Sequence, residues 1–294
     1  MHFPVMLNEV IRCLDPKPGE NFVDCTVGEG GHARAILDRN GPDGRVLGID
    51  LDPEILHKIS MSIKGTDYAN RLLLVHGNFS NLKAIVEKYG FSRISGVLFD
   101  LGFSAWHIEQ SGRGFSLWRN EPLDMRYDLH GSITAEAILN FWSLQDIERI
   151  LRVYGEERFY RRIAREIVDS RPLKTTMDLV MAVERATPRW YHRQRIHFAT
   201  RTFQALRIAV NNELENLEKA LPQAFEVLCN GGRLVVISFH SLEDRIVKNF
   251  MKAKAKEGLL KMLTKKPLKP SMEEVKRNPR SRSAKLRAAA KLFK

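Results

Sequence analysis

Apolar segments alternate with segments of helical spacing over the first hundred residues of the chain. The apolar segments cover residues 21–25, 45–50, 72–75 and 95–100, and helical spacing covers 5–14, a segment ending near 39, 53–63 and 81–88. Short buried strands joined by amphipathic helices are typical of βαβ units and a parallel sheet. In such sheets ligands bind beyond the carboxyl ends of the strands. Asp24, Asp50, Phe79 and Asp100 fall at or just past those ends, so they are candidates for a site.

The pattern changes after Gly102. Residues 103–127 are rich in Gly, Ser, Arg and aromatic residues and have no clear periodicity; loops of that length inside compact domains are usually functional. Residues 134–187 have a helical pattern, with Ser143 as a cap and helices over 156–170 and 177–186. A long helix over 197–221, a second helix up to Cys229 and an apolar segment at 233–239 follow. We therefore expect one α/β domain, residues 1–107 with 206–294, interrupted by an inserted helical domain at 108–205.

The composition excludes several classes of protein. With 294 residues and 44% hydrophobic residues the chain has enough apolar material for a large core. The longest apolar runs are far too short to span a membrane, and the N-terminal segment does not look like a signal peptide. The three cysteines are widely scattered, which favours neither disulfides nor a zinc site. We expect a cytoplasmic protein with no membrane association and no metal, and its oligomeric state is open.

The formal charge of +12 is unevenly distributed. Residues 251–294 hold 15 Lys or Arg and 3 acidic residues, so a basic tail follows a nearly neutral body. Such a tail favours a polyanionic partner, nucleic acid above all, although a solvated tail is the alternative. Residues 108–210 hold 16 Arg, 1 Lys and 13 acidic residues. That composition fits phosphate contacts and a solvated helical surface equally well.

A glycine loop follows the first strand. Gly28, Gly30 and Gly31 lie between an apolar segment and a helical pattern, where backbone N–H groups can approach a nucleotide-like ligand. A tight turn is the alternative. Asp50 lies 19 to 22 residues beyond these glycines, where an acid can bind a ribose diol of either a nicotinamide cofactor or S-adenosylmethionine. Asp24, in front of the loop, favours S-adenosylmethionine because a carboxylate suits an amino or sulfonium group and not a pyrophosphate.

Motifs along nearly the whole chain resemble one family, the bacterial 16S ribosomal RNA (cytosine-N4)-methyltransferases known as MraW or RsmH. The matching stretches are residues 2–6, 24–32, 48–53, 100–102, 113–116, 122–126, 154–157, 202–208, 238–245 and 278–283.

The resemblance implies a class I, Rossmann-like S-adenosylmethionine-dependent methyltransferase sheet with an inserted helical substrate domain. It implies methyl transfer to the exocyclic N4 of a cytidine in the decoding region of small-subunit ribosomal RNA. The cofactor contacts that it implies are Gly30, Gly31, His32, Asp50, Phe79 and Asp100, to which the loop itself adds Asp24 and Gly28. The next contact in the family is a Gln, and this chain has His107 there. The residues before it also depart from the family pattern.

Three residues are candidates for the chemistry. A cytosine amine is a poor nucleophile, so catalysis needs acceptors for its N–H groups and an outlet for one proton. Asp100 is placed for that role or for the cofactor alone. Ser238 and His240 follow the fifth predicted strand, where they and Phe239 suit a flipped base; a capped strand-to-helix turn is the alternative.

The remaining candidates concern RNA. Trp106, Trp118 and Arg119 belong to an aromatic and basic loop suited to stacking and phosphate contact, and a core role is the alternative. From this loop, the turn after strand five and the tail we select as substrate-binding residues Arg113, Phe115, Asp124, Arg126, Ser241, Arg280 and Arg282. Two other function classes stay open: a nicotinamide-dependent oxidoreductase with an RNA-binding tail, and a non-catalytic RNA-binding assembly factor.

Overall fold

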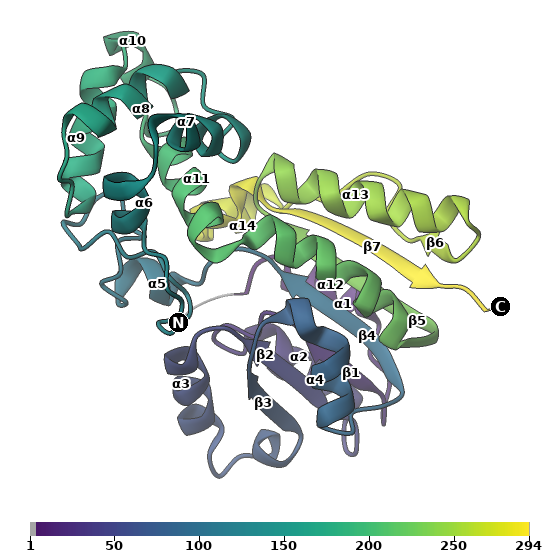
Figure 1. Ribbon diagram of the computed structural model, residues 1–294. Coiled ribbons are helices and arrows are strands. Elements are labelled where there is room, and N and C mark those ends of the chain that lie inside the picture. Colours follow the sequence, from purple (N-terminus) through teal and green to yellow (C-terminus); the bar gives the residue numbers. More distant parts are fainter. Residues whose placement is uncertain (1–3, 294) are drawn as a thin grey trace. The chain divides into compact units, whose positions relative to one another are not determined.

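The computed structural model describes residues 4–293. The chain splits into two compact units (Figure 1): unit 1 runs up to Phe103 and resumes at Leu214, and unit 2 is Ser104–Glu213. The insertion expected at 108–205 lies within unit 2. Of the motif at residues 2–6, His2 and Phe3 lie outside the described residues.

Unit 1 is built on a seven-stranded sheet with the order β3-β2-β1-β4-β5-β7-β6. The first five strands of this order are parallel, which confirms the predicted α/β fold. They are β1 Asn21–Asp24, β2 Val46–Asp50, β3 Leu72–His76, β4 Ile94–Asp100 and β5 Leu228–Ser238. Strand β7 Lys285–Lys291 runs antiparallel to β5, and β6 Leu260–Met262 runs antiparallel to β7.

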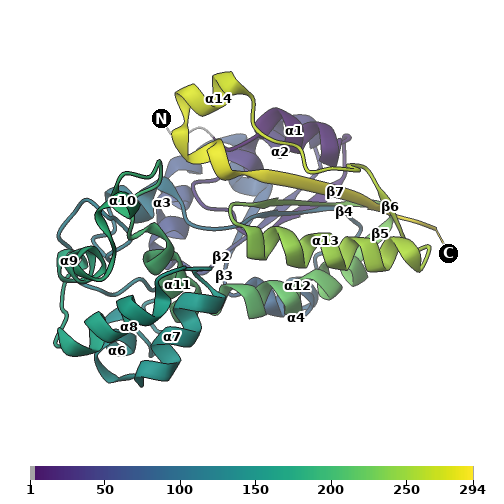
Figure 2. The same cartoon turned by 90° about the horizontal axis from the view of Figure 1, so that it is seen from above.

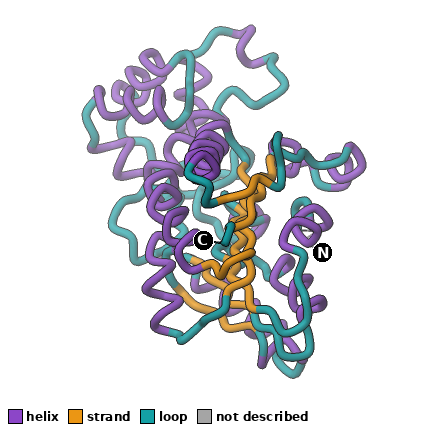
Figure 3. The backbone as a smooth tube through the Cα atoms, turned by 90° about the vertical axis from the view of Figure 1, so that its right-hand side faces the viewer, coloured by secondary structure: helices purple, strands orange, loops and turns teal. Residues whose placement is uncertain are grey.

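Helices cover both faces of this sheet (Figures 2 and 3). One face packs on α4 Leu82–Lys88, α12 Glu213–Val227 and α13 Ser241–Lys256, and the other carries α1 Leu7–Leu14 and α2 Gly31–Asn40. Helix α3 Pro53–Ile63, predicted over 53–63, begins at an Asp52 cap followed by proline. Alternate strand residues such as Val23, Leu47 and Phe99 are fully buried in the core cluster shared with α4, α12 and α13, because successive side chains of a strand point to opposite faces.

The last strand of the basic tail is part of the sheet, so the alternative of a solvated tail is wrong for this strand. In β7 Leu286, Ala288 and Ala289 are fully buried. The Arg287 Nε atom donates to Asp244 Oδ1 at 2.7 Å. Helix α14 Met272–Arg277 and the 3-10 helix Pro279–Ser283 precede the strand. The positive charge of the tail is therefore carried by a folded part of unit 1.

Unit 2 is helical, as the sequence predicts. Its helices are α5 Ala105–Glu109, α6 Ala135–Phe141, α7 Leu144–Val153, α8 Tyr160–Asp169, α9 Thr176–Ala186, α10 Arg189–His192 and α11 Thr200–Asn211. Ser143 caps α7 as expected. The single helix predicted over 197–221 is wrong: Asn212 has a φ of 49°, which ends α11, and α12 then continues through Pro222. Among the described residues no helix is long and apolar enough to cross a membrane.

Candidate functional site

Three acids end three adjacent parallel strands of unit 1. In the register of the sheet Asp24 is paired with Gly48 of β2 and Leu98 of β4, so Asp50 and Asp100 lie two residues further along their strands. This places Asp24, Asp50 and Asp100 at one edge, as the strand pattern predicts. Phe79 follows β3 and starts the 3-10 helix Phe79–Asn81. Its ring packs edge-on against Phe99 with 5.5 Å between centroids.

The glycine loop is fastened to the end of β2. Asp50 accepts hydrogen bonds from the N–H of Gly28 at 2.9 Å and from the N–H of Asp52 at 3.0 Å. Gly28 and Gly30 have φ angles of 51° and 79°, which side chains other than glycine rarely adopt. Gly30 caps α2 without a side chain, and the first turn of α2 has no acidic residue. The start of α2 therefore offers backbone N–H groups to a ligand.

Gly31 has no room for a side chain. A Cβ atom at this position would lie 2.7 Å from Cγ of Pro4. The helix can therefore approach the N-terminal segment only with glycine there. Gly31 therefore packs directly against the N-terminal segment.

Asp24 is buried with an incomplete set of hydrogen bonds. Its Oδ1 accepts the Thr26 N–H at 3.2 Å. Its Oδ2 is buried and has no hydrogen-bond partner among the residues that the structure describes. Burial is the main cause that raises the pKa of Asp24 to about 7; a backbone hydrogen bond from Thr26 opposes it, and the negative charge of Asp50 adds a smaller increase.

Asp100 lies against a histidine. Its Oδ2 is 3.6 Å from Nδ1 of His32, whose Nε2 lies 3.0 Å from the carbonyl oxygen of Val5. Because a carbonyl only accepts, Nε2 carries a proton, and Nδ1 of a neutral ring is then an acceptor facing Asp100. Burial, then the charges of Asp24 and Glu243, raise the pKa of Asp100 well above its usual value.

The second oxygen of Asp100 completes the site. Oδ1 is buried and has no hydrogen-bond partner within residues 4–293. The backbone N–H of Asp100 donates to Oγ1 of Thr26 at 2.7 Å, which fixes the end of β4 to the end of β1. Two adjacent strands therefore each present one uncompensated carboxyl oxygen. Such a pair favours a cation or a hydrogen-bond donor.

The turn after β5 is a capped turn. His240 is the N-cap of α13, and its Nδ1 accepts the Glu243 N–H at 3.4 Å. The Glu243 carboxylate accepts the N–H groups of Phe239 and His240 at 2.8 and 3.2 Å. Ser238 Oγ donates to the Lys285 carbonyl at 3.3 Å, and Ser241 is the first residue of α13. The capping alternative therefore describes this turn, and contact of Ser238, His240 or Ser241 with a substrate base stays a prediction.

Glu243 is a site residue that the sequence analysis missed. Its side chain is buried, and its charge contributes to the raised pKa of Asp100. The available signal was its position three residues after a cap, where an acid completes a capping box.

His107 and the loop of residues 103–127 form an interior cluster in unit 2. The ring of His107 lies 5.1 Å from the rings of both Phe115 and Tyr127, which stack on each other at 5.5 Å. Arg113 lies over the Trp106 ring at 5.0 Å and donates to the Tyr127 carbonyl at 3.0 Å. All five side chains are buried. The expectation that Trp106 and Phe115 form an exposed stacking surface is therefore not supported, whereas Trp118 is 79% exposed.

The other predicted substrate residues differ in exposure. Arg126 forms a bidentate pair with Asp124 at 2.8 and 2.7 Å and also donates to the carbonyls of Leu129 and Gly131. Its side chain therefore links the residues of its own loop to one another. Arg280 and Arg282 are exposed in the 3-10 helix of unit 1.

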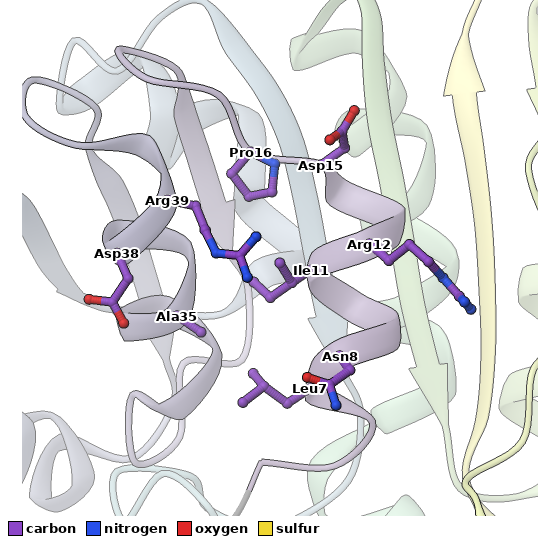
Figure 4. A pocket seen from close by; sticks show the side chains of 9 residues that line it. All are labelled: Leu7, Asn8, Ile11, Arg12, Asp15, Pro16, Ala35, Asp38 and Arg39. Atoms are coloured by element: carbon purple, nitrogen blue, oxygen red, sulfur yellow. The ribbon is translucent and has the colours of Figure 1, made fainter.

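A pocket of about 430 Å³ lies between α1 and α2 (Figure 4). The Arg39 side chain points from α2 toward α1, whereas the Arg12 side chain, on α1, points away from α2. None of the predicted site residues lines this pocket.

Comparison with known proteins gives consistent results. The model of the MraW methylase family matches residues 1–292. The chain is 50% identical over 291 residues to the ribosomal RNA small subunit methyltransferase H of Thermotoga neapolitana, which covers 98% of this chain and 95% of that protein. It is 46% identical over 292 residues to the protein of the same name from Thermosipho melanesiensis, with coverage of 99% and 98%. A provisionally assigned rRNA-methylase structure from Clostridium thermocellum aligns with a TM-score of 0.51 at 15% identity, over 99% of this chain and all of that one, and supports the fold alone.

Proposed function

The chain belongs to the MraW methylase family, as its motifs predicted, and we propose that it transfers a methyl group from S-adenosylmethionine to the N4 atom of a cytidine in small-subunit ribosomal RNA. The curated relatives are named for methylation of that RNA. The decoding region as the target, the cytoplasm as the compartment and the roles of single residues are part of the proposal.

The observation that carries the proposal is the pair of uncompensated carboxyl oxygens on Asp24 and Asp100 beside the glycine loop. S-adenosylmethionine has an ammonium group, a sulfonium centre and a ribose diol, and it supplies an electrophilic methyl group when bound. Asp24 suits the positive groups, Asp50 the diol, and the N–H of Gly31 at the start of α2 the carboxylate of the methionine part. We assign Phe79 to contact with the adenine, because it follows β3, the strand next to β2, which carries Asp50.

The same pair argues against a nicotinamide-dependent oxidoreductase. A pyrophosphate at the glycine loop would place negative charges next to Asp24. Two like charges about 4 Å apart repel by about 4 kcal/mol at an effective dielectric constant near 20. A cationic ligand reverses the sign of that interaction.

Asp100 is the proposed acceptor for the target amine. When N4 forms a bond to carbon it must lose one of its protons, and an acceptor that draws on its N–H group makes the nitrogen lone pair more available. Oδ1 of Asp100 is the buried atom that lacks a donor. A raised pKa suits this carboxylate to receive a proton, and the His32 ring lies 3.6 Å from its other oxygen, Oδ2.

Methyl transfer to purified small subunits tests the proposal. Subunits from cells without the methyltransferase, tritiated S-adenosylmethionine and the full-length protein should give label in the RNA, and mass spectrometry should place it on N4 of a cytidine. Asp100→Asn should lower the rate by about 100-fold or more, whereas Asp43→Asn, a matched change at an exposed turn residue, should leave it unchanged. Label on another atom, or none from a protein that binds S-adenosylmethionine, would contradict the proposal.

A further inference from the structure

One side of α8 carries arginines. Arg161, Arg162 and Arg165 are exposed and fall within about 100° of the helix circumference. The opposite side buries Ile163 and Ile167 in unit 2. The amphipathic pattern therefore fixes which side packs inward, and the arginines occupy the side facing solvent.

An aromatic cluster continues this side of the helix. The guanidinium of Arg158 lies 5.7 Å from the centroid of the Phe159 ring and 5.6 Å from that of Trp190. Phe159 and Trp190 contact each other at 5.8 Å, which joins α10 to the start of α8. The Trp190 side chain is 49% exposed, and its neighbour Arg189 is exposed as well. We refer to Arg158, Arg161, Arg162, Arg165, Arg189 and Trp190 as the arginine face.

The charges of the arginine face lack local compensation. Elsewhere in unit 2 Arg126, Arg185 and Arg207 pair with Asp124, Glu166 and Glu213. Within residues 4–293 the arginines of the arginine face form no ion pair with an acid. The segments 152–169 and 189–195 together contain eight arginines and four acids; of these acids the Glu157 side chain is buried against Tyr191 and Glu166 pairs with Arg185.

These charges do not serve the stability of the helix. The first turn of α8 contains Arg161 and Arg162 and no acid, although the N-terminal end of a helix favours negative charge. The clustered guanidinium groups also repel one another. A polyanion would relieve both effects.

We propose that the arginine face binds single-stranded RNA, with arginines on the phosphates and Trp190 stacking on an unpaired base. The inference rests on the proposed function, in which ribosomal RNA is the substrate. A half-exposed indole beside arginines favours RNA over an acidic protein, since bases stack on aromatic rings and on guanidinium planes. It favours a single strand over a duplex, because a duplex hides the faces of its bases.

Binding of a short fluorescent oligouridine RNA over a salt series tests this. The double variant Arg161→Gln/Arg165→Gln should weaken binding and reduce the slope of log affinity against log salt by about 1.4, since each phosphate contact on a single strand contributes about 0.7. Trp190→Ala should weaken binding by about tenfold, and Trp190→Phe should restore most of it. Arg149→Gln/Lys174→Gln removes the same charge from exposed positions of unit 2 outside the arginine face and should keep the wild-type slope.

Three results would overturn the inference: an Arg161/Arg165 variant that matches the control variant, a Trp190→Ala protein that is folded and binds normally, or an equal loss of binding to polyglutamate. Trp190 packs on Phe159, so melting curves check each variant, and the arginine variants keep the test valid if Trp190→Ala unfolds. Methyl transfer to small subunits by the wild-type protein reports separately on the proposed function. If that reaction fails while the RNA effects hold, the proposed function is wrong and the arginine face stands.

Discussion

Replacing Asp24 by Asn should stabilise the protein without its methyl donor and at the same time weaken binding of that donor. Asp24 is buried, and one of its oxygens has no hydrogen-bond partner among the described residues. Its pKa is raised from 3.8 to about 7, mainly by burial. The charged form is therefore destabilising in the folded protein unless a cation is bound beside it.

The magnitude follows from this shift. From 3.8 to about 7, at 1.36 kcal/mol per pKa unit, the charged form costs about 4 kcal/mol. Because the folded state holds the proton more tightly than the unfolded state, stability falls as the pH rises from about 4 to 7, and the full cost applies above about 7. Asn removes the charge but places an amide donor where Oδ2 has no partner, at a cost of about 1–3 kcal/mol. The net gain is about 1–3 kcal/mol at pH 8 and disappears at pH 5.

Thermal unfolding at the two pH values measures this difference. About 1 kcal/mol corresponds to roughly 2–4 °C for a unit of this size, so Asp24→Asn should raise the melting temperature by several degrees at pH 8 only. Asp50→Asn is the matched control with the opposite sign, because Asp50 accepts two backbone N–H groups and its loss should destabilise unit 1. Calorimetry should show weaker binding of S-adenosylmethionine to Asp24→Asn. A variant that melts at or below the wild-type temperature at pH 8 would refute the assigned cost.

Four further predictions follow from the site. Asp100→Asn should keep donor affinity within a few-fold in calorimetry while single-turnover methyl transfer slows by about 100-fold or more; a loss confined to affinity would contradict its role as acceptor. His32→Gln replaces the ring beside Asp100 by an amide donor that favours the carboxylate, so the acid limb of the rate–pH profile should move to lower pH, and an unmoved limb would show that His32 does not influence Asp100. Gly31→Ala places a methyl group 2.7 Å from Pro4 and should lower both the melting temperature and the donor affinity. Wild-type values would show that the N-terminal segment around Pro4 can move to accommodate the methyl group. Truncation before Lys285 removes β7, which pairs with β5 and β6, so unit 1 should fail to fold. A folded product with weakened RNA binding would instead show that the tail is needed for RNA binding and not for folding.

The strand ends were predictable because their signals are local. A run of apolar residues that ends in an acid marks both the strand and its terminus, and this held for Asp24, Asp50 and Asp100. The helical spacing that begins at Pro53 likewise marked the start of α3.

The remaining errors concern contacts distant in sequence. Residues 285–291 read Lys-Leu-Arg-Ala-Ala-Ala-Lys, which has no preference for a strand, and pairing with β5 and β6 decides their conformation. Asn212 adopts a left-handed conformation between two helices, whereas Pro222, the stronger breaker by propensity, lies inside α12. Burial of Phe115 depends on stacking with Tyr127, and no local pattern indicates it.

Uncompensated charge distinguishes the two proposed binding features from the other ionised groups described above. The half-buried Asp244 is balanced by Arg287 and Lys285, and Arg207 by Glu213; groups in such pairs need no ligand. Asp24 and Asp100 each leave a buried carboxyl oxygen without a partner in the described part of unit 1, and the arginine face leaves positive charge uncompensated in unit 2. Each feature acts against folding stability in the absence of a partner of opposite sign. A cationic methyl donor at the first and an RNA strand at the second are the partners that remove these penalties, and a single enzyme acting on RNA needs both.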